Sequence, residues 1–170
     1  MNELPKRKNI RLSSYNYNQN GAYFITVCTH NKKDLLSHIV GRIHESPEIQ
    51  LTEYGQIVNN IIKTIPDRFS VSVDKYVIMP NHIHFLLTID NPCVRAIRES
   101  PLQGRSLISK VIGYLKMNAS KDIHKLGHNG EIWQRSFYDH IIRDQNDYND
   151  IWQYIDTNPE TWVQDKLYTE

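Results

Sequence analysis

The sequence has 170 residues, of which 39% are hydrophobic and 23% charged; this composition suits one globular domain and argues against a two-domain enzyme. A formal net charge of +1 excludes a uniformly basic or acidic chain. The two cysteines, Cys28 and Cys93, form no CxxC pair, which excludes a disulfide framework and a thiolate zinc site and favours a reducing compartment. With no apolar signal region and no apolar run near the roughly 18 residues of a membrane span, we expect a cytoplasmic protein.

The charges are unevenly distributed along the chain. Residues 1–11 carry four basic side chains against one acidic side chain, and residues 95–125 carry seven against two. Residues 139–170 reverse the balance, with two basic and eight acidic side chains. The two basic regions are compatible with solvated surfaces and equally with surfaces that hold a phosphate backbone.

The first third of the chain predicts an arm, a strand and a loop. Residues 1–20 form a polar, basic arm that ends in a turn-forming run. Residues 22–29 are β-branched and aromatic throughout, which predicts a buried strand. Residues 31–50 are expected to be a loop with a short hairpin around Gly41.

Two amphipathic helices are predicted next. Thr52 is the candidate N-cap of the first helix, whose apolar residues recur at three- and four-residue steps until Pro66, where we expect it to end. The second helix covers residues 106–126. Its lysines lie on one face, and its other face is apolar: Leu107, Ile108, Val111, Ile112, Leu115 and Met117.

The remaining segments predict three more strands and a last helix. Residues 71–79 and 82–89 read as two antiparallel strands, residues 90–104 as a linker, residues 132–143 as a final strand and residues 145–158 as a last helix. The order strand, helix, strand, strand, helix, strand, helix predicts an α+β fold. It is the ferredoxin-like split βαβ arrangement of an antiparallel sheet, with an added C-terminal helix.

Two histidines on one strand are the first candidate chemical group. His82 and His84 stand at positions i and i+2, so both imidazoles emerge on the same face of the sheet, while Ile83 points the opposite way. Such a pair can hold a metal ion or be purely structural. A metal would need further ligands, such as a carboxylate, an amide oxygen or water, and Mg²⁺ or Mn²⁺ would leave positions open for substrate oxygens.

The last helix carries a tyrosine that its apolar stripe does not use. Tyr148, Ile151, Trp152 and Ile155 form the stripe expected to face the core. Tyr154 lies about 110° from the centre of that stripe, and Asn158 lies about 40° from Tyr154. Tyr154 is therefore either a half-exposed surface residue or a nucleophile beside a metal site.

Four separated segments resemble the REP-associated tyrosine transposases, a family of the single-tyrosine HUH transposases. The segments are GAYFITVCT at 21–29, VIMPNHIH at 77–84, IWQRSFYDHIIR at 132–143 and YIDTNP at 154–159. They occur in the family's order over nearly the whole chain. The resemblance implies the same ferredoxin-like fold, and it implies that residues 21–160 are the catalytic domain, between the arm of residues 1–20 and a tail of residues 161–170.

The resemblance also implies roles for individual residues. His82 and His84 match the metal ligands of the HUH pair, Asn158 matches the residue that completes the metal site, and Tyr154 matches the nucleophile. A divalent cation, Mg²⁺ or Mn²⁺, would polarise a DNA phosphate, and attack by Tyr154 would give a 5′-phosphotyrosine and a free 3′-hydroxyl. The implied function is transposition by cleavage and rejoining of single-stranded or hairpin DNA, including REP-type repeats.

The basic regions then gain a role in gripping the DNA backbone. The DNA-binding residues expected are Lys6, Arg7, Lys8, Arg11, Arg105, Lys110, Lys116 and Lys121. The expected partner is single-stranded or hairpin DNA, and no membrane partner is expected. The protein would be cytoplasmic and associated with the nucleoid when it binds DNA. A homodimer and a monomer are both compatible with the sequence, with the tyrosine acting in its own subunit or in the other.

Three alternatives remain open at this point. The chain is compatible with a DNA-binding regulatory protein of the same fold without cleavage, and with a metal phosphodiesterase that attacks with water. The second predicts that Tyr154→Phe leaves turnover intact. A metal site at His124 and His128 would use i, i+4 spacing, which Gly127 interrupts.

Overall fold

The computed structural model describes residues 19–41, 47–90 and 106–168. Nearly all of the predicted arm and of the predicted linker lie outside these residues. So do five of the basic residues proposed to bind DNA: Lys6, Arg7, Lys8, Arg11 and Arg105.

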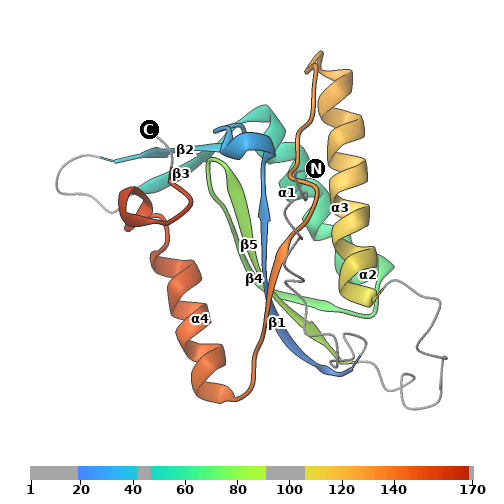
Figure 1. Cartoon of the computed structure of the whole chain (residues 1–170), viewed down its shortest axis with the longest axis vertical. Helices are drawn as coiled ribbons and strands as arrows, with labels where there is room; N and C mark the ends of the chain where they lie inside the picture. Colours follow the sequence, from blue (N-terminus) through green and yellow to red (C-terminus); the bar gives the residue numbers. More distant parts are fainter. Residues whose placement is uncertain (1–18, 42–46, 91–105, 169–170) are drawn as a thin grey trace, which may run out of the picture.

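A four-stranded antiparallel sheet forms the centre of the molecule (Figure 1). Its strands are β4 (Ser72–Ile78), β5 (His82–Ile89), β1 (Gly21–Cys28) and β6 (Tyr138–Ile141), in that spatial order. Every neighbouring pair is antiparallel. This order, with the first strand between the third and the last of the sheet, is the predicted ferredoxin-like arrangement, and the fold class is confirmed.

The two faces of the sheet are covered differently. Tyr23, Ile25 and Val27 alternate along β1 and are fully buried in the main core, together with residues of α1 (Glu53–Lys63) and α3 (Leu107–Lys125). The other face packs against α4 (Gln145–Thr157), whose Ile155 is buried beside Leu86. Figure 1 shows α3 and α4 on opposite sides of the sheet. The strand alternation therefore sends one set of side chains to the core and the other toward α4.

A separate hairpin follows β1. After the 3₁₀ turn η1 (His30–Lys32), β2 (Ser37–Val40) pairs with β3 (Glu48–Leu51), which gives the hairpin predicted around Gly41 a definite register. Thr52 then caps α1 as predicted, since its hydroxyl accepts a hydrogen bond from the Gly55 N–H at 3.1 Å. A Cβ at Gly55 would lie 2.0 Å from the Leu36 carbonyl oxygen, so glycine allows this close approach.

Three expectations about helices were wrong in detail. Helical structure does not stop at Pro66: α1 ends at Lys63, and Pro66 lies in the first turn of α2 (Ile65–Arg68), where its missing N–H is not needed. Met117 is 66% exposed, because it lies off the face of α3 that meets the sheet. Trp152 is 38% exposed, and the Lys75 ammonium lies 4.3 Å from the centre of its ring.

The last part of the chain is irregular before and after α4. The final strand is shorter than predicted, because Trp133 makes only an isolated bridge with Thr29 before β6 begins. Residues after Thr157 turn back and form the short 3₁₀ helix η3 (Trp162–Gln164). Trp162 is buried and closes a small second core with Val77, Met79, Leu86 and Ile155.

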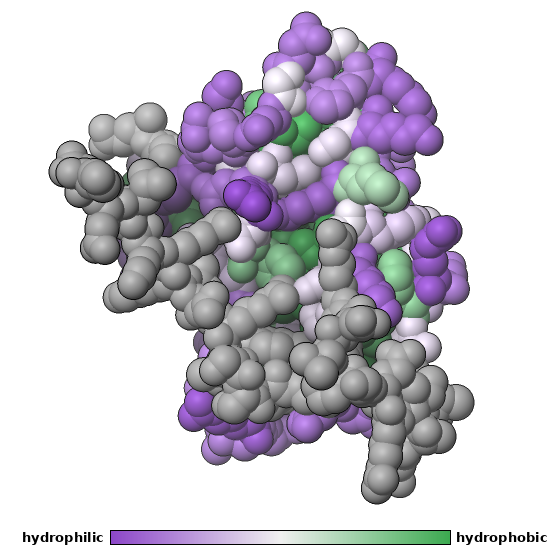
Figure 2. All heavy atoms as spheres, turned by 45° about the vertical axis from the view of Figure 1, so that its right-hand side comes forward, coloured by the Kyte–Doolittle hydropathy of each residue, from purple (hydrophilic) through white to green (hydrophobic). Residues whose placement is uncertain are grey.

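The described residues on the α3 side form a mostly hydrophilic surface (Figure 2). Figure 2, which brings the α3 side forward, shows hydrophilic side chains over much of this face, with apolar side chains visible among them. In the part of the chain that the structure describes, no helix combines the length and the apolar character needed to cross a membrane.

Candidate active site

His82 and His84 lie on the face of the sheet that meets α4. They are 0% and 2% exposed, and their Nε2 atoms are 3.0 Å apart. Ile83 between them is buried in the main core on the other face. The strand alternation thus directs two imidazoles to one point, as predicted from their spacing.

Each imidazole is oriented by a neighbouring side chain through its other nitrogen. His82 Nδ1 lies 2.9 Å from Asn81 Oδ1, and His84 Nδ1 lies 2.9 Å from Thr26 Oγ1. Because an amide oxygen only accepts, His82 carries its proton on Nδ1 and has a free lone pair on Nε2. The Thr26 hydroxyl donates or accepts, so it suits either tautomer of His84.

Burial keeps both imidazoles uncharged at neutral pH. Loss of solvation lowers the pKa of His82 to about 4. The same effect, with the neighbouring His82, lowers the pKa of His84 well below its ordinary value. A neutral imidazole is the form that binds a metal ion.

Tyr154 extends from α4 toward this pair. Its hydroxyl lies 3.4 Å from His84 Nε2 and donates a hydrogen bond to Asp165 Oδ2 at 3.1 Å. Burial, followed by the negative charge of Asp165, raises the pKa of Tyr154 to about 12. The side chain is still 41% exposed, so a substrate can reach its oxygen.

Asp165 and Asn158 complete the polar cluster. Asn158 Nδ2 donates to Asp165 Oδ2 at 2.9 Å, and the Leu167 N–H donates to Asp165 Oδ1 at 2.6 Å. Although burial opposes it, these hydrogen bonds lower the pKa of Asp165 below its ordinary value. Asn158 is fully buried, and its Oδ1 has no hydrogen-bond partner among the described residues.

These donors fit a divalent cation. His82, His84 and Asp165 each offer one ligand atom, and these atoms lie within 4.8 Å of one another. The unpaired Oδ1 of Asn158 is a buried acceptor that costs free energy unless something binds it. Two neutral imidazoles, a carboxylate and an amide oxygen form a mixed nitrogen and oxygen set that accepts Mg²⁺, Mn²⁺ and several transition metals.

The sequence reasoning missed Asp165. Its signal was weak, because it lies among many acidic residues in a segment without helical or strand periodicity. It reaches the histidines only because the chain turns back after Asn158 and forms η3. The predicted residues His82, His84, Tyr154 and Asn158 do lie around one point, with Asp165 linking the last two.

The predicted DNA-binding lysines that the structure describes lie on α3, away from this cluster. Lys110 and Lys121 are exposed there. Lys116 is half-buried, and its ammonium donates to the carbonyl oxygens of Gln134 and Ser136 at 2.6 and 2.7 Å. Burial lowers the pKa of Lys116 to about 8. Lys116 therefore ties α3 to the segment before β6.

The alternative pair, His124 and His128, lacks further ligands. Their rings stack with centroids 6.4 Å apart, and His124 Nε2 lies 2.9 Å from the Gly130 carbonyl oxygen. Within the described residues, no third His, Cys, Asp or Glu joins them in a metal-binding group.

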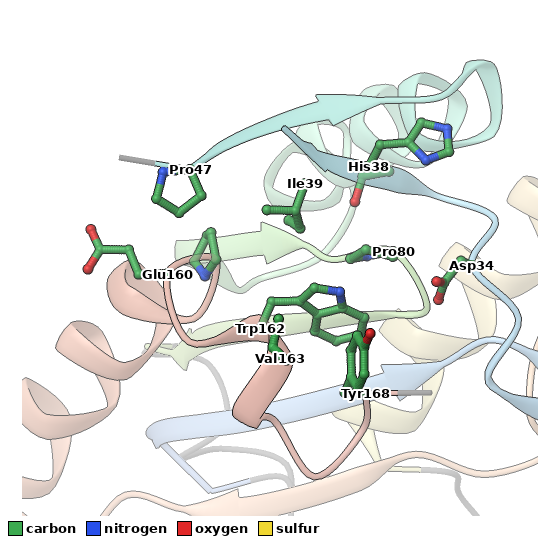
Figure 3. A pocket seen from close by; sticks show the side chains of 11 residues that line it. Asp34, His38, Ile39, Pro47, Pro80, Glu160, Trp162, Val163 and Tyr168 are labelled. Carbon is green, nitrogen blue, oxygen red and sulfur yellow. The ribbon is translucent and has the colours of Figure 1, made fainter. Parts of the chain in front are cut away.

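A hollow of about 550 Å³ lies behind the histidines, between the C-terminal segment and the β2–β3 hairpin. Figure 3 shows Trp162 and Tyr168 side by side on one wall, with Ile39 across from them. The Trp162 ring also packs against His82, with centroids 5.7 Å apart. Trp162 thus separates this hollow from the polar cluster.

Comparisons with known proteins bear on the identity of this fold and cluster. No protein-family model matches the chain. An uncharacterised protein of Haemophilus influenzae is 36% identical over 174 residues, which cover 96% of this chain and 94% of that protein. A second protein of that species, provisionally named as a REP-associated tyrosine transposase, is 25% identical over 151 residues, or 87% of this chain and 76% of its own length.

A solved structure of a REP-associated tyrosine transposase bound to a REP hairpin has the same fold. It matches with a TM-score of 0.60 and 22% identity, over 98% of this chain and 77% of that one. The fold of this chain is therefore that of a REP-associated tyrosine transposase, and its sequence is similar to that of a protein provisionally named as one. This similarity supports an enzyme of the transposase kind.

Proposed function

We propose that this protein is a metal-dependent transposase that cleaves and rejoins single-stranded or hairpin DNA through a phosphotyrosine on Tyr154. One observation carries the proposal: the Tyr154 hydroxyl lies 3.4 Å from His84 Nε2, at the edge of a group of three metal-binding side chains. A tyrosine beside a divalent cation is a suitable nucleophile for a phosphodiester.

The residues that would hold the cation are His82, His84 and Asp165, with Asn158 Oδ1 as a fourth donor. When bound, a divalent cation polarises the phosphate and offsets the negative charge that develops on it in the transition state. Asn81 and Thr26 hold the imidazole rings so that both Nε2 atoms point to the proposed cation site.

Tyr154 supplies the attacking oxygen. Its Oη forms a bond to phosphorus while the bond from phosphorus to the 3′ oxygen breaks, which leaves a 5′-phosphotyrosine. The departing 3′ oxygen takes up a proton and becomes a hydroxyl. The phenol proton leaves toward Asp165 Oδ2, which already accepts the hydrogen bond of Tyr154, or toward water. With a pKa of about 12, raised first by burial and then by the charge of Asp165, Tyr154 is a phenol at neutral pH, so its proton leaves as the oxygen attacks.

The covalent ester also explains rejoining. A 3′-hydroxyl of another strand attacks the same phosphorus, and the Tyr154 oxygen leaves with a proton. The phosphoester bond is conserved through both steps, so no external energy source is needed. The exposed lysines on α3, Lys110 and Lys121, and the basic arm would hold the DNA backbone outside the cluster.

The test is an adduct assay on the full chain. Hairpin DNAs with single-stranded flanks, labelled at the 5′ or the 3′ end, are incubated with and without Mg²⁺ or Mn²⁺ and separated on denaturing gels. We expect a metal-dependent adduct between the protein and the fragment's 5′ phosphate. Tyr154→Phe should abolish it, whereas Tyr148→Phe, on the same helix with its hydroxyl bonded to Asp74, should not.

Other outcomes of this assay would indicate a different function. Cleavage without an adduct that survives Tyr154→Phe would mean that water is the nucleophile, as in a metal phosphodiesterase. Tight binding of a REP-type hairpin with neither cleavage nor adduct would instead indicate a regulatory DNA-binding protein.

A further inference from the structure

A row of three side chains crosses the sheet beside the polar cluster. Thr26 on β1 pairs in register with His84 on β5 and with Tyr138 on β6. Directly opposite residues of antiparallel strands present their side chains on the same face, so all three point toward the α4 side. Since neighbouring strands are about 4.8 Å apart, Tyr138 stands roughly 10 Å from His84 across the sheet.

A hollow of about 600 Å³ lies over this row. Its wall includes the rings of Phe24, Tyr138 and Tyr154 as well as Thr26 and His84. The Phe24 ring is held in place: its centroid lies 4.9 Å from that of His84, and its ring is nearly perpendicular to that of Tyr154, with centroids 5.9 Å apart. The hollow thus includes the candidate nucleophile in its lining and has aromatic rings on part of its wall.

Tyr138 is unusually exposed for its size. Among the described residues, the exposed Phe, Tyr and Trp side chains are Tyr138 at 50%, Tyr154 at 41% and Trp152 at 38%. One face of the Trp152 ring already contacts the Lys75 ammonium, and Tyr154 has the proposed role of nucleophile. Tyr138 therefore presents an apolar ring face to solvent at the edge of the hollow, where stacking of a flat apolar ligand would remove that face from water.

Positive charge lies on the other side of the same hollow. Lys166 lines it, and the Lys32 ammonium donates to the Lys166 carbonyl oxygen at 3.2 Å, which brings a second lysine to this edge. An aromatic platform with lysines nearby has the chemistry of a nucleotide subsite, because the ring stacks on a base while the ammonium groups attract the phosphates.

We propose that this hollow binds the nucleotide joined to the phosphodiester that Tyr154 attacks, with its base stacked on Tyr138. This inference rests on the proposed function and adds a positioning residue to it. A phosphate beside Tyr154 and His84 places the sugar of one neighbouring nucleotide over Thr26. The base of that nucleotide then reaches Tyr138, two strands away from His84. Stacking in this position aligns the strand without contacting the reacting atoms.

The experiment uses the full chain and hairpin DNAs that carry the fluorescent base 2-aminopurine. The bond that is cleaved is first mapped with the adduct assay, and 2-aminopurine is then placed on either side of it. Stacking quenches this fluorophore. We expect 2-aminopurine fluorescence to be quenched at one of the two positions with the wild-type protein and with Tyr138→Phe, and at neither position with Tyr138→Leu.

The rate of adduct formation provides the second measurement. Tyr138→Leu should raise the DNA concentration needed for half-maximal rate by about 5- to 160-fold, the range expected when one base-stacking side chain is removed, and leave the rate at saturating DNA within a few-fold. Tyr114→Leu is the matched control, because Tyr114 lies on α3 across the sheet and bonds to Thr64. It should change neither the quenching nor the concentration dependence.

The outcomes separate the two proposals. If the unchanged chain forms the adduct but Tyr138→Leu gives the same quenching and the same concentration dependence, the stacking inference is wrong and the proposed function stands. If a folded Tyr138→Leu protein instead loses rate by the same factor at saturating and at low DNA concentrations, Tyr138 has a structural role and the inference is again overturned. If the unchanged chain forms no adduct, both proposals fail.

Discussion

Thr26 is the hydrogen-bond partner of His84 Nδ1, and its hydroxyl can pair with either tautomer of that imidazole. Its hydroxyl lies 2.9 Å from His84 Nδ1, while His84 Nε2 faces His82 Nε2 at 3.0 Å. Since His82 Nε2 has a free lone pair, the contact between the rings needs the His84 proton on Nε2, and Thr26 then donates to Nδ1. When His84 binds a cation through Nε2, its proton moves to Nδ1 and the Thr26 hydroxyl becomes the acceptor.

We therefore predict that Thr26→Val weakens Mn²⁺ binding by about 10- to 100-fold, the usual effect of removing the partner that orients a ligating histidine. Valine has the shape of threonine but no hydroxyl, so His84 Nδ1 loses its partner. Titration of Mn²⁺ followed by electron paramagnetic resonance measures the affinity. Thr26→Ser restores the hydroxyl and should bind Mn²⁺ nearly as well as the unchanged chain; equal affinity in Thr26→Val would contradict the prediction.

Lys116 shows how a basic residue can serve the fold instead of a ligand. Its ammonium donates to two carbonyl oxygens of the segment before β6. We predict that Lys116→Met lowers the free energy of unfolding by about 1–2 kcal/mol, because both carbonyls lose a charged donor at a partly exposed site. Denaturant titration measures this change.

The control for Lys116 is Lys110→Met, an exposed position on the same helix that should stay within about 0.5 kcal/mol of the unchanged chain. A Lys116→Met chain of undiminished stability, whose DNA affinity depends less steeply on salt, would instead mean that this ammonium neutralises a DNA phosphate.

At the scale of elements, α4 has the strongest link to the proposed chemistry because it presents Tyr154. Its N-cap is Asp144, whose carboxylate accepts hydrogen bonds from the N–H groups of Asn146 and Asp147, both at 2.9 Å. The negative charge also favours this end of the helix dipole. The far end is anchored by Ile155, buried beside Leu86.

We predict that Asp144→Ala destabilises the protein by about 0.5–2 kcal/mol and increases hydrogen exchange in the first turn of α4. Asp144→Asn keeps a cap oxygen and should retain most of the stability. Chemical denaturation and amide exchange measured by mass spectrometry provide the two readings. Loss confined to elements other than α4 would show that the cap contributes little.

The elements also show what the sequence could predict about the site. Strand alternation was enough to bring His82 and His84 to one face, and the helical wheel was enough to set Tyr154 and Asn158 apart from the core stripe. The wheel failed at Trp152 because it assumes that the whole stripe meets the core, whereas Lys75 covers this ring. Asp165 was unpredictable, since its position depends on a non-periodic turn and on packing of Trp162 against His82.

At the scale of the whole molecule, a cation bound by the cluster would stabilise the fold. A ligand that binds only the folded state adds about 2.7 kcal/mol at 100 times its dissociation constant, or roughly 5–10 °C in Tm for a chain of this length. We predict such a rise with Mn²⁺, reversed by a chelator. His82→Ala should lose the rise, while His38→Ala, at an exposed position on β2, should keep it. The same rise in His82→Ala would place the ion elsewhere.

The cluster joins parts of the chain that are made at different times. His84 and Tyr154 are 70 residues apart, and Asp165 comes 11 residues later still. At a synthesis rate of about 5–20 residues per second, the ribosome adds Tyr154 roughly 4–14 seconds after His84. A nascent or prematurely terminated chain that ends before Tyr154 therefore contains the histidine pair but no nucleophile, so a DNA strand that it meets remains uncut.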